Sequence, residues 1–101
     1  LYTKVEAARS MTYRAAQSFN HDRYVEKGAI SFETTKLIAM AKIFVGDVAS
    51  EVADQVVQFH GGMGYLEDLW VARYFRDSRL LRIGGGTNEV MKHYVARILG
   101  F

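Results

Sequence analysis

The sequence of 101 residues contains no cysteine and no proline. Without cysteine the chain cannot form a disulfide bridge, a thiolate-ligated zinc site, an iron–sulfur cluster or a thiol nucleophile. Proline averages about 5% of residues in proteins, and its absence leaves no helix interior broken by a missing backbone donor. Since half of the residues are hydrophobic, a core can form without disulfide or metal support.

A strong net charge and long apolar runs are missing as well. Thirteen basic and eleven acidic side chains give a formal net charge of +2, which is too small to indicate a nucleic-acid partner. Charged residues interrupt every apolar stretch, and the first residues lack a signal-peptide pattern, so we expect neither a membrane span nor secretion. These absences predict one soluble globular domain over residues 1–101.

Apolar residues recur at helical spacing in four segments, and no segment alternates as a strand would. The predicted helices run from Leu1 to about Asn20, from Ser31 to Phe59, from Asp68 onward and from Thr87 to Gly100. The pattern therefore predicts an all-α fold, an antiparallel four-helix bundle.

The residues at the predicted helix ends are typical of caps and turns. Ser31, Asp68 and Thr87 are good N-cap residues, and Gly100 is a good C-terminal stop. Connecting turns are expected at Asn20–Ile30, Gly61–Asp68 and Gly84–Gly86, whereas Leu80–Ile83 fits no single pattern. Because Leu1 is not a methionine and already stands in helical register with Val5, we interpret the chain as part of a longer protein.

Two glycine clusters are the most informative local features. Gln58–Gly64 reads Gln-Phe-His-Gly-Gly-Met-Gly, and a second run reads Gly84-Gly85-Gly86-Thr87. Both can be simple helix-connecting turns, but glycine also lets backbone approach a ligand closely. The second cluster places free N–H groups at a predicted helix N-terminus, which is a favourable position for an anion or a polar cofactor edge.

Other chemistry-bearing residues have ordinary structural explanations. His93 follows Glu89 by four residues, but no third ligand accompanies them, so we predict no metal site. The arginines could attract phosphate, although a solvated face paired with acidic neighbours is the favoured interpretation. The arginines are Arg73, Arg76, Arg79 and Arg82, their expected partners are Glu67, Asp68 and Asp77, and the methionines Met40, Met63 and Met91 are expected in the core.

Taken together, these motifs resemble the end of acyl-CoA dehydrogenases. That family carries Q-x-x-G-G-x-G-Y, then R-x-x-R-D, then I-x-x-G-T-N-E, and the segment from Gln58 to Phe101 contains all three in order. Upstream, K-x-E-A-A-R and A-K-I-F-V-G-D-V-A are similar to the same family. Three motifs in order at the right separations are far more specific than any one of them alone.

The resemblance implies a C-terminal helical domain that packs on an N-terminal helical domain and a middle β-domain. It implies FAD-dependent α,β-dehydrogenation of an acyl-CoA thioester to trans-2-enoyl-CoA, with electrons passing to an electron-transfer flavoprotein or a similar acceptor. Family members are usually homotetramers, so we expect a homo-oligomer, in the cytoplasm of a bacterium or in the mitochondrial matrix.

Site residues follow from the same resemblance, position by position. The first matched stretch touches the FAD of a neighbouring subunit, and a second stretch also contacts FAD; Gly86 matches a position near bound substrate. The first stretch is Gln58, Phe59, His60, Gly61 and Gly62, and the second is Thr87, Asn88 and Glu89.

One position departs from the common family pattern. Many members place the catalytic glutamate immediately before the Gly-Thr pair, where this chain has Gly85, and glycine cannot accept a proton. In the isovaleryl-type and long-chain-type branches this position is also small and the base lies upstream, so the chain resembles those branches and is expected to be inactive alone. Glu89 is close by, but the helix dipole should keep it a weak base. The alternative is a non-catalytic helical assembly or scaffold module.

Overall fold

The computed structural model describes all 101 residues and contains helices and turns but no strand, which confirms the all-α prediction. Four main helices are connected by shorter helical turns. The elements are α1 (Tyr2–Asn20), a π-helical turn (His21–Val25), α2 (Phe32–His60), α3 (Gly62–Tyr65), α4 (Trp70–Ser78), a 3₁₀ turn (Arg79–Arg82) and α5 (Asn88–Leu99).

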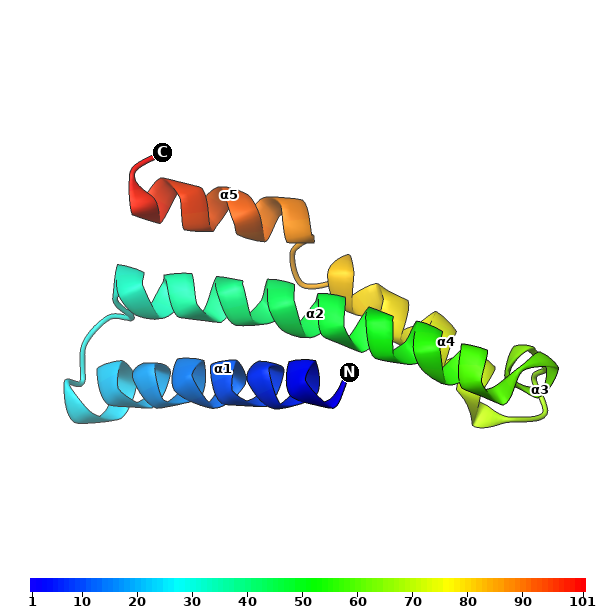
Figure 1. Cartoon of the computed structure of the whole chain (residues 1–101). Helices are drawn as coiled ribbons and strands as arrows, with labels where there is room; N and C mark the ends of the chain where they lie inside the picture. Colours follow the sequence, from blue (N-terminus) through cyan, green and yellow to red (C-terminus); the bar gives the residue numbers. More distant parts are fainter.

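Helix α2 is the axis on which the other main helices pack (Figure 1). Helices α1 and α5 run antiparallel to the first half of α2 along its two sides, and α4 runs antiparallel to the second half. None of these three helices packs substantially against another. The chain is therefore elongated, 51 × 27 × 21 Å with a radius of gyration of 16.3 Å, against about 13 Å for a compact domain of 100 residues.

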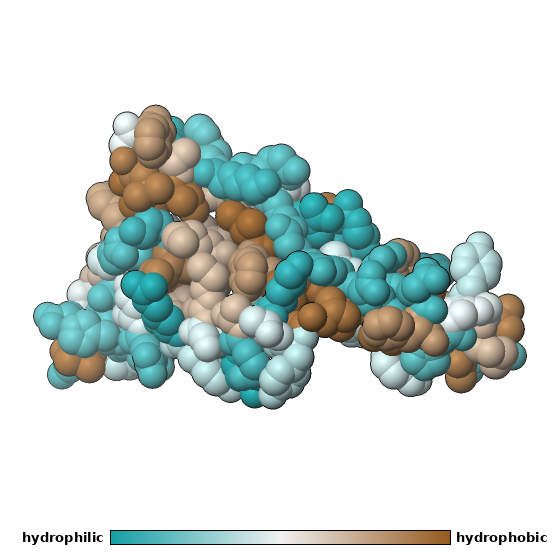
Figure 2. All heavy atoms as spheres, in the orientation of Figure 1, coloured by the Kyte–Doolittle hydropathy of each residue, from teal (hydrophilic) through white to brown (hydrophobic).

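The buried core is small and consists largely of alanine. Only 13 of the 101 residues are buried, and five of the eight apolar ones are Ala8, Ala15, Ala39, Ala41 and Ala53. The accessible surface of 7278 Å² exceeds the roughly 5,800 Å² expected of a compact monomer of this mass. Apolar side chains reach the surface between α5 and the first half of α2 (Figure 2). The fold thus leaves apolar faces without a partner inside the chain.

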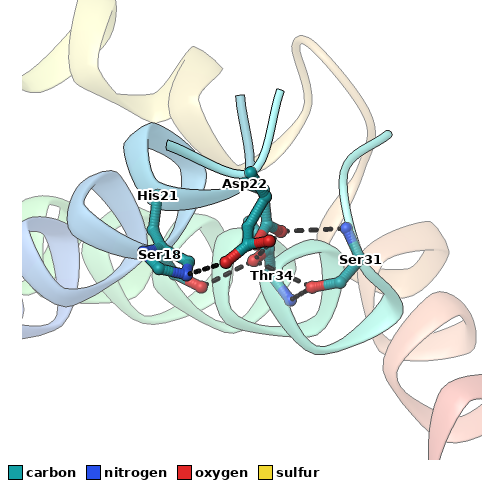
Figure 3. Close-up of polar contacts among 6 residues, drawn as sticks. Ser18, His21, Asp22, Ser31 and Thr34 are labelled. Atoms are coloured by element: carbon teal, nitrogen blue, oxygen red, sulfur yellow. Dashed lines mark hydrogen bonds and ion pairs between the residues drawn. The ribbon is translucent and has the colours of Figure 1, made fainter. Parts of the chain in front are cut away.

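The corner between α1 and α2 is more regular than the loop predicted at Asn20–Ile30. Helical backbone continues from α1 through His21–Val25 as a π-helical turn. Asp22 explains this extension, because its Oδ2 accepts hydrogen bonds from the Ser31 N–H at 2.9 Å and the Thr34 hydroxyl at 2.6 Å (Figure 3). Since the Thr34 hydroxyl and the Ser31 N–H bond to the charged form, they lower the pKa of Asp22.

Most predicted helix ends are confirmed. Ser31 and Thr87 have extended backbone, and their side chains accept hydrogen bonds from the N–H groups of Thr34 (3.1 Å) and Val90 (3.2 Å). Gly100 is left-handed, with φ 93°, and the N–H groups of Gly100 and Phe101 bond to the carbonyls of Arg97 and Ala96, which is a Schellman motif.

Two details of the prediction for residues 61–83 need correction, and the structure resolves one segment that the sequence left open. The turn predicted at Gly61–Asp68 contains one turn of helix, α3. Asp68 is not the cap of α4, because the N-cap residue is Leu69 and no side chain caps this helix. The ambiguous segment Leu80–Ile83 mostly continues α4 as the 3₁₀ turn Arg79–Arg82. As for membranes, none of these helices combines the length and the apolar character that a transmembrane span needs.

Candidate functional site

The turn before α5 leaves five consecutive backbone donors free. The N–H groups from Gly85 to Glu89 make no hydrogen bond within the chain, whereas those of Val90 and Met91 bond to Thr87. Free N–H groups at a helix N-terminus favour an anion or a polar acceptor. The structure therefore confirms the local geometry that the sequence predicted at this turn.

Glycine is required at Gly86 for two reasons. Its φ of +105° lies in the region that side chains rarely adopt, and a Cβ would come within 2.5 Å of Met91 Cε. At Gly85 the φ of +69° is also left-handed, but the nearest atom to an added Cβ, Lys42 Cε, lies at 3.5 Å. The space that a side chain at Gly86 would need is thus filled by Met91, and Gly85 offers no side chain that could accept a proton.

Asn88 is the one buried residue of α5 and carries an unsatisfied acceptor. Its side chain is 3% exposed, and its Nδ2 donates to Asp47 Oδ1 at 2.8 Å. The Nε of Arg82 lies 2.9 Å from the same carboxylate oxygen. Because Asp47 needs a donor, the amide orientation is fixed, and the Oδ1 of Asn88 is left buried without a partner. A buried acceptor of this kind is normally satisfied by an ordered water molecule or a bound ligand.

The other two members of this stretch, Thr87 and Glu89, have different roles. Thr87 is half-buried, and its hydroxyl caps α5 by accepting the hydrogen bond from the Val90 N–H. Glu89 is exposed in the first turn of α5, where a carboxylate stabilises the helix dipole. The backbone N–H groups of both residues are among the free donors, so a ligand here meets mainly peptide groups.

The first matched stretch, Gln58–Gly62, lies at the far end of α2 and is open to solvent. Gln58, Phe59 and His60 are exposed, Phe59 to 74% of its surface. His60 bonds through Nδ1 to the carbonyl of Val56 at 2.8 Å, which anchors its ring to the helix. Gly61 ends α2 with φ +59°, ψ −143°, a conformation essentially restricted to glycine. An exposed phenylalanine next to a glycine turn fits a surface covered by another molecule.

The two stretches do not come together within one chain. Asn88 contacts α2 at Asp47, and Gln58 follows Asp47 by eleven residues, or roughly 17 Å along a helix. Each stretch therefore forms a separate surface. The sequence predicted both stretches, but it held no signal for their distance, which depends on the packing of α5 on α2.

The predicted pairing of the arginines with nearby acidic residues is wrong in this chain. No ion pair joins Arg73, Arg76 or Arg79 to a carboxylate, and Arg82 pairs with Asp47 instead. Arg73 and Arg76 line a hollow of about 690 Å³ beside α3 and α4. Glu67 and Asp77 line the same hollow, but neither carboxylate forms an ion pair with these arginines.

A second hollow of about 780 Å³ lies between α5 and the start of α2. Its walls are mainly apolar and include Phe32, Val90 and Tyr94. Glu89 and His93 also line it. No group of three side chains in the structure could hold a metal ion.

Sequence reasoning missed two residues that hold the turn, Lys42 and Asp47 of α2. The segment A-K-I-F-V-G-D-V-A that contains them contributed only to the resemblance. The available signal was their charge, because both stand in a helix whose surrounding positions are apolar. Nothing in the sequence indicated that the turn before α5 would pack there.

Comparison with known proteins points to the same family as the sequence motifs. A family model described as "Acyl-CoA dehydrogenase, C-terminal domain" matches residues 1–100. A cyclohexane-1-carbonyl-CoA dehydrogenase of Geobacter metallireducens is 37% identical over 95 residues, 94% of this chain and 23% of the relative. The CarC subunit of the caffeyl-CoA reductase-Etf complex of Acetobacterium woodii is 32% identical over 97 residues, 96% of this chain and 23% of the relative.

A solved structure, from work on the electron transferring flavoprotein of Acidaminococcus fermentans and flavin-based electron bifurcation, has the same fold. Its TM-score is 0.82 at 40% sequence identity, and the match covers 98% of this chain and 24% of that chain. This chain thus spans about a quarter of the proteins that it matches.

Proposed function

Because the chain belongs to the acyl-CoA dehydrogenase family, whose C-terminal domain it matches over residues 1–100, we propose that it serves an FAD-dependent acyl-CoA dehydrogenase. In this proposal the chain is the C-terminal helical domain of a longer enzyme with an N-terminal helical domain and a middle β-domain. The enzyme converts an acyl-CoA thioester to trans-2-enoyl-CoA.

The observation that carries this proposal is the turn from Gly85 to Glu89. Its unpaired N–H groups are donors and the buried Oδ1 of Asn88 is an acceptor, a set that a polar cofactor edge can satisfy. Thr87, Asn88 and Glu89 would hold FAD there, and Gly86 would lie near the substrate. The flavin supplies the acceptor for the hydride that leaves the β-carbon.

The separate surface at Gln58–Gly62 would contact the FAD of a neighbouring subunit. Its exposure, and its distance of roughly 17 Å from the α5 turn along α2, support a contact with a second molecule over one with the same cofactor. The excess accessible surface supports assembly as well, because apolar faces of this extent are normally covered by other domains or subunits. We propose a homotetramer.

The catalytic base is proposed to lie outside this chain, upstream of Leu1. Gly85 stands where many relatives carry the catalytic glutamate. Glu89 lies in the first turn of α5, where its carboxylate stabilises the helix dipole. On this ground we propose that the chain is nearer the isovaleryl-type and long-chain-type branches. The chain's own residues then bind and orient, while a carboxylate from another segment removes the α-proton.

For the electron acceptor we propose an electron-transfer flavoprotein or a similar partner. The A. woodii relative is named as a subunit of an Etf complex, and the similar solved structure comes from work on an electron transferring flavoprotein. The proposed compartment is the bacterial cytoplasm or the mitochondrial matrix.

A non-catalytic scaffold is the competing proposal, and Gly85 is the observation that favours it. The deciding experiment is to purify the full-length protein and record its visible spectrum before and after adding acyl-CoA thioesters. An enzyme carries flavin absorbance that an acyl-CoA bleaches. A colourless protein that takes up no added FAD would support the scaffold and contradict the enzyme.

A further inference from the structure

Lys42 of α2 lies against the glycine turn. Its Nζ donates hydrogen bonds to the carbonyl of Gly86 at 2.5 Å and to the carbonyl of Leu81 at 3.2 Å. None of the ion pairs in the chain includes Lys42. Its ammonium group therefore bridges two backbone carbonyls, one at Leu81 within the 3₁₀ turn and one at Gly86 just before α5.

Asp47, on the same helix, holds the same segment through side chains. It accepts from Asn88 Nδ2 at 2.8 Å and pairs with Arg82 Nε at 2.9 Å. Between Lys42 and Asp47, Gly46 lets the segment come close, because a Cβ there would lie 3.3 Å from the Leu81 carbonyl oxygen. Helix α2 thus fixes residues 81–88 at four points.

The bond from Lys42 sets the direction of one of the free donors. In a trans peptide the C=O and the N–H point in opposite directions, and the chain has no cis peptide. Since the Gly86 carbonyl points to Lys42, the N–H of Thr87 points away from α2.

We propose that Lys42 is a positioning residue: it orients the Gly86–Thr87 peptide and thereby sets the affinity of this turn for FAD. The identity of the ligand rests on the proposed function, whereas the orientation of the turn does not. Lys42 itself lies on the opposite side of the peptide from the ligand, so it acts through the backbone of the turn.

The test uses full-length apoprotein with Lys42→Met, which keeps the aliphatic stem and removes the charge. We expect FAD to bind about tenfold more weakly because, of the two hydrogen bonds that Lys42 loses, the charge-assisted bond to the Gly86 carbonyl is the one that orients the turn. Deuterium uptake over residues 80–91 should rise, because the bonds from Ile83 and Gly84 to Leu80 and from Met91 to Thr87 lose their support. Lys42→Arg should restore most of the affinity.

Lys36→Met is the matched control, since Lys36 also lies on α2 but pairs locally with Glu33 at 2.8 Å; it should leave both measurements unchanged. Unchanged uptake in Lys42→Met would overturn the positioning role. Raised uptake with unchanged FAD affinity would overturn its link to the cofactor. If wild-type apoprotein bound no FAD at all, the proposed function would fail, and the uptake measurement would still decide whether Lys42 orients the turn.

Discussion

The N-termini of α2 and α5 begin with nearly the same local structure but have opposite surroundings. Ser31 has φ −69°, ψ 160°, and Thr87 has φ −66°, ψ 160°; each side chain caps the N–H three residues later. At α2 the carboxylate of Asp22 occupies the end of the helix. At α5 no side chain does so, and the donors from Gly85 to Glu89 stay free.

This difference separates a structural helix end from one available to a ligand. Asp22 is in effect an anion supplied by the chain itself, accepting the Ser31 N–H and the Thr34 hydroxyl. An anion at α5 must come from another molecule. The comparison predicts that mutations at the N-terminus of α2 change stability alone, and that mutations at the N-terminus of α5 also change cofactor binding.

The largest effect on stability is expected from Thr34→Val. Thr34 is fully buried, and its hydroxyl contacts Asp22, Ser31 and Ser18. Removing the hydroxyl should lower the free energy of unfolding by about 2 kcal/mol, because buried polar partners lose their bonds. Urea unfolding measures this change. FAD affinity should not change; a loss of FAD binding would break the comparison.

Thr35→Val is the control for this substitution. Thr35 is exposed, and its hydroxyl bonds only to the Ser31 carbonyl. It should change the free energy of unfolding by less than about 0.5 kcal/mol, as is usual for surface substitutions.

Gly86→Ala should come next, with a loss of about 1–2 kcal/mol from left-handed strain and a clear loss of FAD affinity. Gly100→Ala is matched to it, because Gly100 has φ 93° and no atom within 4 Å of an added Cβ. It should lower stability by a similar amount and leave FAD titrations unchanged. Equal FAD affinity in the two variants would contradict a ligand site at Gly86.

The two caps provide the most direct comparison. Ser31→Ala and Thr87→Ala should each lower the free energy of unfolding by about 1 kcal/mol, the usual value of an N-cap. Only Thr87→Ala should reduce the flavin retained on purification, measured as the ratio of flavin to protein absorbance. Gln58→Ala should reduce it too, without a comparable loss of stability, because Gln58 is exposed and caps nothing.

The smallest expected effect is on the free energy of unfolding at acidic pH. The folded pKa of Asp22 lies below its ordinary value of 3.8, chiefly because the Thr34 hydroxyl bonds to the carboxylate. A lowered folded pKa contributes stability that is present above the unfolded pKa and is lost as the pH falls through the folded pKa. Stability should therefore decline below about pH 4, and Asp22→Asn should flatten that decline in a series of urea titrations. An unchanged decline in Asp22→Asn would show that other carboxylates cause it.

Sequence alone determined the parts of this protein that depend on neighbours within a few residues. Ser31, Thr87 and Gly100 act at their own helix ends through bonds that reach three to five residues, so local chemistry was sufficient to predict them. The order of the motifs was enough to identify the family. The prediction that Asp68 caps α4 was wrong. The chain forms the short helix α3 at Gly62–Tyr65 and α4 begins after Leu69, and no local pattern in the sequence specified this.

Only the tertiary structure decided which groups meet across the fold. The π-helical turn exists because Asp22 reaches Ser31 and Thr34. The α5 turn is held because α2 brings Lys42 and Asp47 beneath it. These contacts join residues up to 44 positions apart, and such pairs are fixed by how helices pack, which a single sequence does not encode locally. Packing likewise decided that one capped helix end received a carboxylate and the other remained free.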